Sequence, residues 1–201
     1  MHPLLKRLTW SLHTVGLFLR NPRDPWRAES NFDDRWKRRI QKMATYIDSA
    51  GEVADFGCGM MWLKEFLPLG NRYIPIDCVS RSKDTIVRDL NRDGLPTTNA
   101  EFAFFSGILE YIEDLPGFMQ RVADQGFRRI ILSYCVTETH ANRWIRHSLT
   151  WKSHASTAQL LRLTLQHGYV LTALDEMDNN TIFVFDATKQ RPSLPVAPSS
   201  L

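Results

Sequence analysis

The sequence predicts an α/β fold in which a mostly parallel sheet carries helices on its faces. Short apolar runs alternate with helix-like segments along the chain, which is typical of βα units. The first run, Val53 to Phe56, stops at the glycine turn Gly57-Cys58-Gly59. Runs without polar alternation, such as Phe102 to Ser106, indicate strands buried on both faces. With 201 residues, 43% of them hydrophobic, the chain fits one domain with one core.

The N-terminal part is basic and precedes this domain. Apolar residues recur every three or four positions between residues 4 and 19, which predicts an amphipathic helix, and a Pro-rich linker follows up to residue 30. The helix either packs on the domain or lies on a membrane surface or a partner. Residues 1–39 carry nine Lys/Arg and four Asp/Glu, although the whole chain has a net charge of only +3.

The domain is expected to span residues 31–187. Asn31 is predicted to cap a helix that runs to about Asp48. Further helices are expected at 60–67, 115–125 and 157–167, the last capped by Ser156 or Thr157. Strands are expected at 53–56, 72–77, 84–88, 102–106 and 129–134.

The two ends of the expected sheet are unusual. Only residues 78–83 separate the second strand from the third, which is short for a parallel crossover. Strands at 169–176 and 181–186 flank the polar turn 177–180 and predict a hairpin, so the sheet finishes with an antiparallel strand. The Pro- and Ser-rich tail, residues 188–201, is predicted to be disordered.

The glycine turn favours a ligand with a cationic or hydroxyl-bearing part. The amide groups of a helix N-terminus suit a phosphate, but the carboxylate of Asp55 at the strand end would repel it. Asp77 ends the second strand 18 residues beyond Gly59. In nucleotide-binding βαβ units, an acid at that strand end accepts hydrogen bonds from ribose hydroxyls. Asp89 follows the third strand at the same edge, where it could accept a purine amino hydrogen.

The motif Asp55-x-Gly57-x-Gly59, together with Asp77, Asp89 and the run 107–112, resembles class I S-adenosylmethionine-dependent methyltransferases over residues 31–187. It is most similar to small bacterial members, some linked to cell-envelope sugars. The resemblance implies a Rossmann-like three-layer sandwich whose seven-stranded, mostly parallel sheet has one antiparallel strand. Two positions depart from the family pattern: Met61 stands at the usual third glycine, and the second crossover is short.

The resemblance also implies S-adenosyl-L-methionine as cofactor and assigns residues to its parts. The methionine part would lie along the glycine turn, the ribose at an acid and the adenine beside the next acid, while the sulfonium would pass near the end of the fourth strand. The residues so assigned are Asp55, Gly57, Cys58 and Gly59, then Asp77, then Asp89 and Leu90, and finally Ser106 and Leu109.

A hydroxyl acceptor would also need a general base. His154 is the first candidate because it lies just before a helix at the expected substrate face, and His140 and Glu110 follow. Each of the three also has a structural or solvated interpretation. The basic residues Arg143, Arg146 and Lys152 favour an anionic acceptor such as an acidic glycan, or form a solvated face.

Two other functions compete. A nicotinamide-dependent oxidoreductase would need a glycine where Trp62 stands, and its pyrophosphate would face Asp55. A non-catalytic S-adenosylmethionine-binding or scaffold protein on the same fold is left open by Met61. No nucleic-acid partner is expected, and the oligomeric state is not indicated.

The cysteines and the hydropathy bear on compartment and metal binding. The three cysteines are odd in number and lack metal-ligand spacing, so we expect reduced thiols and no metal. No apolar run reaches the roughly 18 residues that span a bilayer. A cytoplasmic protein is expected, with peripheral contact at the inner membrane through residues 4–19 as an open hypothesis.

Overall fold

The computed structural model describes residues 26 and 28–188. The predicted helix over residues 4–19 lies outside the described residues, and so do most of the linker and residues 189–201 of the predicted tail. Thr188, the first residue of that tail, donates from its backbone amide to the carbonyl of Gly168 at 2.8 Å. Among the described residues, no helix has the length and apolar character needed to cross a bilayer.

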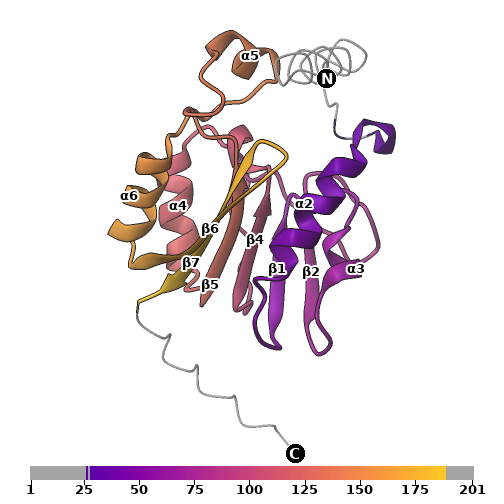
Figure 1. The fold of residues 1–201 in the computed structure, drawn as a ribbon. Coiled ribbons are helices and arrows are strands. Elements are labelled where there is room, and N and C mark those ends of the chain that lie inside the picture. Colours follow the sequence, from indigo (N-terminus) through magenta and orange to yellow (C-terminus); the bar gives the residue numbers. More distant parts are fainter. Residues whose placement is uncertain (1–25, 27, 189–201) are drawn as a thin grey trace, which may run out of the picture.

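A seven-stranded sheet in the order β3-β2-β1-β4-β5-β7-β6 forms the middle layer (Figure 1). Strands β3, β2, β1, β4 and β5 run parallel to one another, whereas β7 runs antiparallel to both β5 and β6. The predicted sandwich with one antiparallel strand is therefore confirmed. The strands are β1 (Glu52–Phe56), β2 (Arg72–Asp77), β3 (Ile86–Val87), β4 (Phe102–Ser106), β5 (Arg129–Tyr134), β6 (Tyr169–Met177) and β7 (Asn180–Ala187).

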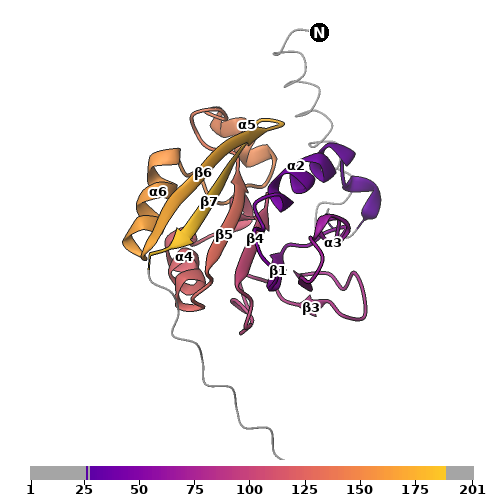
Figure 2. The ribbon, with the colours of Figure 1, turned by 60° about the horizontal axis from the view of Figure 1, so that its bottom comes forward.

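Helices cover both faces of the sheet (Figure 2). Helices α2 (Asp34–Ala44) and α3 (Leu63–Phe66) pack on one face over Val53, Phe104 and their neighbours. Helices α4 (Leu115–Asp124) and α6 (Thr157–Gln166) pack on the other, over a larger cluster that includes Phe56 and Phe105, whose rings stack at 4.7 Å. Because alternate residues of each strand belong to opposite clusters, both faces are apolar.

The start of α2 differs from the prediction. Asn31 belongs to a short 3-10 helix, η2 (Glu29–Asn31), and Phe32 and Asp33 are extended. Asp33 is the N-cap instead, because its Oδ1 accepts the amide hydrogen of Arg35 at 2.9 Å. The helix also ends at Ala44 rather than near residue 48.

The segment after the glycine turn is shorter than predicted. Met61 has a φ of +55°, in the left-handed region, so a helix cannot begin at residue 60. The crossover from β2 to β3 contains no helix. It is a tight turn in which the hydroxyl of Thr85 accepts the amide hydrogens of Arg81 (3.2 Å) and Ser82 (2.9 Å). Strand β3 is accordingly reduced to two residues.

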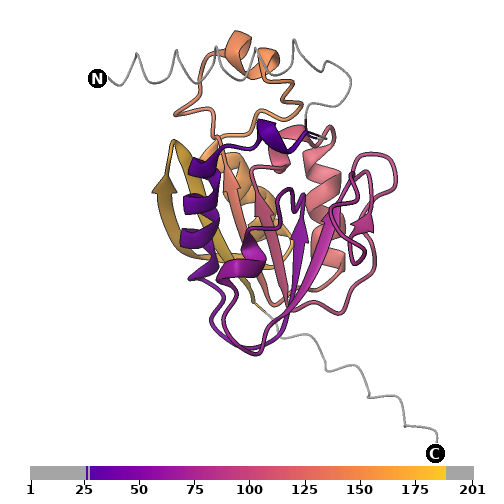
Figure 3. The same cartoon turned by 90° about the vertical axis from the view of Figure 1, so that its right-hand side faces the viewer.

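The segment 137–152 lies beyond the carboxyl ends of the strands (Figure 3). It contains helix α5 (Arg143–Ser148), capped by Asn142, whose Oδ1 accepts from the amides of Trp144 and Ile145. Ser156 caps α6 through a capping box with Gln159. The β6–β7 hairpin turns at residues 178 and 179, which both have positive φ.

Candidate functional site

A cavity of about 260 Å³ lies at the carboxyl ends of β1, β2 and β4. This is where the strand order reverses, between β1 and β4, and open α/β sheets bind ligands at such a point. The wall made by the strand ends and the turns that follow them is here called the rim. The opposite wall comes from residues before α2 and after β4 and β5.

Asp77 ties the rim together. Its Oδ2 accepts the amide hydrogen of Gly59 and its Oδ1 that of Val79, each at 2.9 Å. The amides of Gly57 and Cys58 both donate to the carbonyl of Ile76. The predicted spacing of Gly59 and Asp77 thus reflects a direct hydrogen bond between neighbouring strand ends. Each carboxylate oxygen keeps a further acceptor site for a ligand hydroxyl.

Gly59 and Gly107 leave no room for a side chain. Both have positive φ, +49° and +69°. A Cβ on Gly59 would lie 2.5 Å from the ring of Phe32, and a Cβ on Gly107 would lie 2.9 Å from Nη2 of Arg39. Close packing of the backbone therefore requires glycine at both positions.

Six of the nine residues assigned to the cofactor line the cavity. Asp55, Cys58 and Leu109 do not. Asp55 lies on the α3 side of β1, buried, and its Oδ2 accepts from the hydroxyl of Tyr73 at 2.8 Å. Burial raises the pKa of Asp55 to about 7. The six that line the cavity are Gly57, Gly59, Asp77, Asp89, Leu90 and Ser106.

The loop 89–91 forms the end wall beside Asp77. Oδ1 of Asp89 accepts the amide hydrogen of Asn91 at 3.0 Å. The side chain of Asn91 donates to the carbonyl of Tyr111 and accepts from the amide of Glu113, each at 3.0 Å. These bonds join the loop after β3 to the loop after β4, so the two walls are held at a fixed spacing.

Glu110 is the one predicted catalytic residue that lines the cavity. It belongs to the 3-10 helix η3 (Leu109–Tyr111) after β4 and is only 2% exposed. Its Oε1 accepts the amide hydrogen of Cys135 at 2.8 Å, whereas its buried Oε2 has no hydrogen-bond partner among the described residues. Burial raises the pKa of Glu110, and the Cys135 amide and the charges of Arg39 and Arg146 oppose that rise.

The two histidines lie outside the cavity lining. Nδ1 of His154 accepts from Nε of Arg146 at 2.9 Å, and burial, followed by the charge of Arg146, lowers the pKa of His154. His140 bonds to the hydroxyl of Thr139 at 2.9 Å and packs its ring against Trp151. Neither histidine lines the cavity, and a role for either as a general base stays a prediction.

The basic group that favoured an anionic acceptor is also outside the lining. Arg146 is buried and donates to the carbonyls of Cys135 (2.6 Å) and Ser153 (3.1 Å). Lys152 is paired with Glu113 at 3.6 Å. Arg143 is exposed on α5.

Arg39, which the sequence analysis did not single out, lies in the cavity wall. It is 6% exposed, its Nε donates to Oγ of Ser106 at 3.3 Å, and burial lowers its pKa. Among the described residues it has no carboxylate within ion-pair distance. Its signal was present in the sequence, because it stands on the apolar stripe of α2 between Trp36 and Met43.

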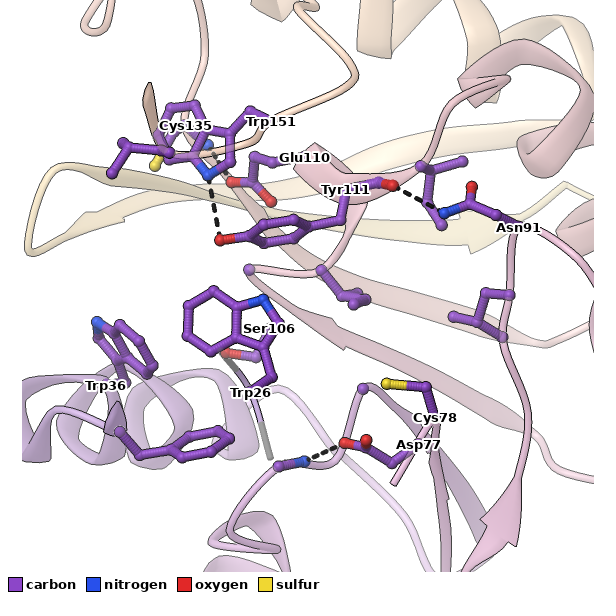
Figure 4. A pocket seen from close by; sticks show the side chains of 18 of the residues that line it. Trp26, Trp36, Asp77, Cys78, Asn91, Ser106, Glu110, Tyr111, Cys135 and Trp151 are labelled. Carbon is purple, nitrogen blue, oxygen red and sulfur yellow. Dashed lines mark hydrogen bonds between the residues drawn. The ribbon is translucent and has the colours of Figure 1, made fainter. Parts of the chain in front are cut away.

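Aromatic side chains form much of the remaining wall, from Phe32 beside Gly59 to Tyr111 and Trp151 across the cavity, and we call them the aromatic cover (Figure 4). The ring centroid of Trp26 lies 5.5 Å from that of Tyr111 and 5.8 Å from that of Trp36. Nε1 of Trp151 donates to the hydroxyl of Tyr111 at 3.3 Å. Arg81 donates to the carbonyl of Trp26 and lies over the ring of Phe32. The aromatic cover consists of Trp26, Phe32, Trp36, Tyr111 and Trp151.

In the described part of the chain, no three His, Cys, Asp or Glu side chains converge on a point that could hold a metal ion. The cavity lining brings together the rim, Arg39, Glu110 and the aromatic cover.

No protein-family model and no curated protein sequence matches the chain. Solved structures do match it. The Burkholderia thailandensis 1,6-didemethyltoxoflavin-N1-methyltransferase, with bound 1,6-didemethyltoxoflavin and S-adenosylhomocysteine, is 13% identical at a TM-score of 0.62, over 94% of this chain and 92% of that one. A putative Haloferax volcanii methyltransferase, in complex with the Trm112 activator, is 13% identical at 0.67, over 87% and 98%.

The magnesium protoporphyrin IX methyltransferase of Synechocystis, with bound S-adenosylhomocysteine, is 12% identical at a TM-score of 0.61, over 76% of this chain and 84% of that one. At such low identity the similarity concerns the fold. The chain has the fold of class I S-adenosylmethionine-dependent methyltransferases.

Proposed function

We propose that the protein transfers a methyl group from S-adenosylmethionine to a small-molecule acceptor. The observation that carries the proposal is the Asp77 carboxylate, which joins the glycine turn to the end of β2 at the sheet's switch point. The three solved structures named above are methyltransferases, and two of them hold S-adenosylhomocysteine.

The residues of the cavity suit the parts of this cofactor. Asp77 accepts the ribose hydroxyls, and Asp89 with Leu90 receives the adenine. Gly57 and Gly59 let the methionine part lie against the backbone, with the sulfonium near Ser106. Arg39 binds the methionine carboxylate, because it is a buried guanidinium without a described carboxylate partner. Asp55, Cys58 and Leu109 support the rim from behind.

When bound, the cofactor supplies a methyl group on a positively charged sulfur, which is an electrophile without further activation. The chain itself has to hold the acceptor in line with that methyl group and exclude water. The aromatic cover does both, because it closes the cavity with apolar rings. Glu110 is the general base that we propose in place of His154 and His140.

An acidic cell-envelope glycan is not part of this proposal. The residues that favoured an anionic acceptor, Arg143, Arg146 and Lys152, lie outside the cavity lining, and the wall nearest to them is aromatic. A polyhydroxylated acceptor would find few hydrogen-bonding partners there.

Calorimetric titration of the full chain tests the cofactor assignment. We expect S-adenosylmethionine and S-adenosylhomocysteine to bind and NADH not to bind. Binding of NADH alone would indicate the oxidoreductase, and binding of none of the three would refute the site. Transfer of labelled methyl groups into a fractionated small-molecule extract then separates an enzyme from a scaffold, because a scaffold binds the cofactor without turnover.

A further inference from the structure

The two ends of the cavity differ in chemistry. Around Asp77 and Asp89 the lining offers carboxylates and backbone amides. The aromatic cover lines much of the rest of the cavity, and Ile108 and Leu149 are further apolar residues of the lining. A planar conjugated molecule gains stacking and edge-to-face contacts in such a chamber, whereas a sugar would lose hydrogen bonds to water there.

One polar atom of the lining is unsatisfied. Within the described part of the chain, the buried Oε2 of Glu110 has no hydrogen-bond partner, although Oε1 accepts from the Cys135 amide at 2.8 Å. The nearby thiol of Cys135 is itself engaged, since Sγ donates to Oδ1 of Asn180 at 3.4 Å. A buried oxygen that lacks a donor is destabilising, so a ligand that brings an N–H or O–H gains what the empty site lacks.

The backbone holds Glu110 firmly at this place. The amides of Lys152 and Ser153 donate to its carbonyl at 2.7 and 3.0 Å, which joins η3 to the segment after α5. Strand β4 ends at Ser106, and Glu110 follows four residues later in η3. Arg39 connects the two, because it donates to Ser106 and its charge faces Glu110. The base is thus anchored beside the position that the proposed function gives to the sulfonium.

We propose that the acceptor is a planar aromatic or heteroaromatic molecule whose N–H or O–H group meets Oε2 of Glu110 while its ring lies within the aromatic cover. This inference rests on the proposed function. In the reaction, the acceptor heteroatom attacks the methyl carbon, and the carbon–sulfur bond breaks with its electron pair kept by sulfur. The proton of the heteroatom passes to the Glu110 carboxylate, and S-adenosylhomocysteine and the methylated acceptor leave.

Matched probes test the ring and the donor separately. Quenching of tryptophan fluorescence, with S-adenosylhomocysteine present, measures the binding of 2-naphthol, of saturated decahydro-2-naphthol and of 2-methoxynaphthalene, which lacks the donor. We expect 2-naphthol to bind about tenfold or more tightly than 2-methoxynaphthalene, because a hydrogen bond to a charged group contributes that much affinity. It should bind about fivefold or more tightly than decahydro-2-naphthol, which keeps the donor and loses the aromatic ring contacts. Equal affinity for the saturated alcohol, or for methyl glucoside, would overturn the aromatic assignment.

Two variants locate the site. Glu110→Gln should reduce the preference for 2-naphthol over 2-methoxynaphthalene to within about threefold and leave the affinity for 2-methoxynaphthalene unchanged. Trp26→Leu should weaken both naphthalenes, whereas the control Trp144→Leu, an 86% exposed residue on α5, should change neither. An unchanged preference in Glu110→Gln, or equal losses in the two tryptophan variants, would refute the placement.

The pH dependence gives a further readout. The groups that face Glu110 are Arg39 on α2, Arg146 on α5, Tyr134 on β5, Cys135 after that strand, and Tyr111 beside Glu110. A rise of methyl transfer with pH that is lost in Glu110→Gln reports on this carboxylate. If the full chain does not bind S-adenosylmethionine at all, the proposed function fails. If it binds the cofactor without preferring planar probes, only the present inference fails.

Discussion

The rim and the aromatic cover face each other across one cavity but are built in different ways. The rim comes from adjacent strand ends, and its contacts join backbone to backbone or backbone to the Asp77 carboxylate. The cover joins Trp26 and Trp36 to Tyr111 and Trp151 through ring packing and one side-chain hydrogen bond. Sheet register therefore fixes the rim, whereas individual side chains fix the cover.

Because side-chain packing rather than sheet register holds the aromatic cover, we expect the cover and not the rim to move when ligands enter. The cavity, at about 260 Å³, is smaller than the roughly 300–1,000 Å³ of usual ligand pockets. In Figure 4 the indole of Trp26 stands between the rim, marked by Asp77 and Cys78, and Tyr111 on the opposite wall. We expect the cofactor and the acceptor to enter together only when Trp26 shifts, while the rim stays in place.

Substitutions in the rim should cause the largest loss of affinity for S-adenosylmethionine. Asp77→Ala removes the acceptor of two backbone amides, and Gly59→Val places a branched side chain against Phe32 at a positive φ. Each variant should lower the affinity for S-adenosylmethionine by at least about a hundredfold in calorimetry and retain the native circular dichroism spectrum. Rigid backbone contacts leave no alternative arrangement.

Two controls match these variants. Gly94 also has a positive φ, +70°, but no atom lies within 4 Å of the place that a Cβ would take there, so Gly94→Val carries the backbone strain without the clash. Asp84→Ala removes an exposed acid from the neighbouring loop. Equal losses in a variant and its control would mean that the rim is not the binding wall.

Replacing Asp55 should change how the free energy of unfolding depends on pH and should leave cofactor binding nearly unchanged. Its pKa in the folded protein, about 7, is above the unfolded value, so the folded state holds more protons and becomes less stable as pH rises from about 4 to 7. Asp55→Asn cannot ionise, yet it keeps an acceptor for Tyr73. Its free energy of unfolding relative to wild type should rise by about 3 kcal/mol between pH 5 and pH 8 in urea denaturation.

The affinity of Asp55→Asn for S-adenosylmethionine should stay within about threefold of wild type, because the side chain lies outside the cavity lining. A tenfold loss would restore Asp55 to the contact that the sequence motif predicted for it. A stability difference that does not vary with pH would show that Asp55 ionises normally.

Replacing Arg39 should weaken the binding of S-adenosylhomocysteine without lowering the melting temperature. Arg39→Met removes a buried charge that burial destabilises, so the melting temperature should be unchanged or higher. The affinity for S-adenosylhomocysteine should fall about tenfold, whereas 5′-methylthioadenosine, which lacks the carboxylate, should bind equally to both proteins. Arg38→Met, at the exposed neighbouring position, is the control. Parallel losses for the two ligands would exclude a carboxylate contact.

The sequence predicted the rim because local rules determine it. Glycines at a strand end and an acid at the next strand end have a fixed relation once the strands are parallel. The motif did not indicate on which face of the strand Asp55 lies. Because side chains alternate along a strand, its carboxylate shares a face with Val53 and α3.

The cover could not be predicted in the same way. It joins Trp26 to Trp151 through Tyr111, by contacts between segments far apart in the sequence, and no local pattern specifies such packing. His154 looked suitable from its place before α6, but the sequence did not reveal that Arg146 would donate to it. Arg39 was within reach of sequence analysis, as a charge on an apolar helix stripe.

The exposed basic residues of segment 137–152 should give the smallest effect. Only Leu149 and Trp151 of this segment line the cavity among the described residues. Arg143→Ala and Lys152→Ala should therefore change the affinity for S-adenosylhomocysteine less than about twofold and the stability by less than about 0.5 kcal/mol, as surface substitutions usually do. Calorimetry and urea denaturation measure both. A larger loss of binding in either variant would mean that the cover extends to these side chains when the ligand enters, and that the division of the cavity into a rigid rim and a purely aromatic wall is too simple.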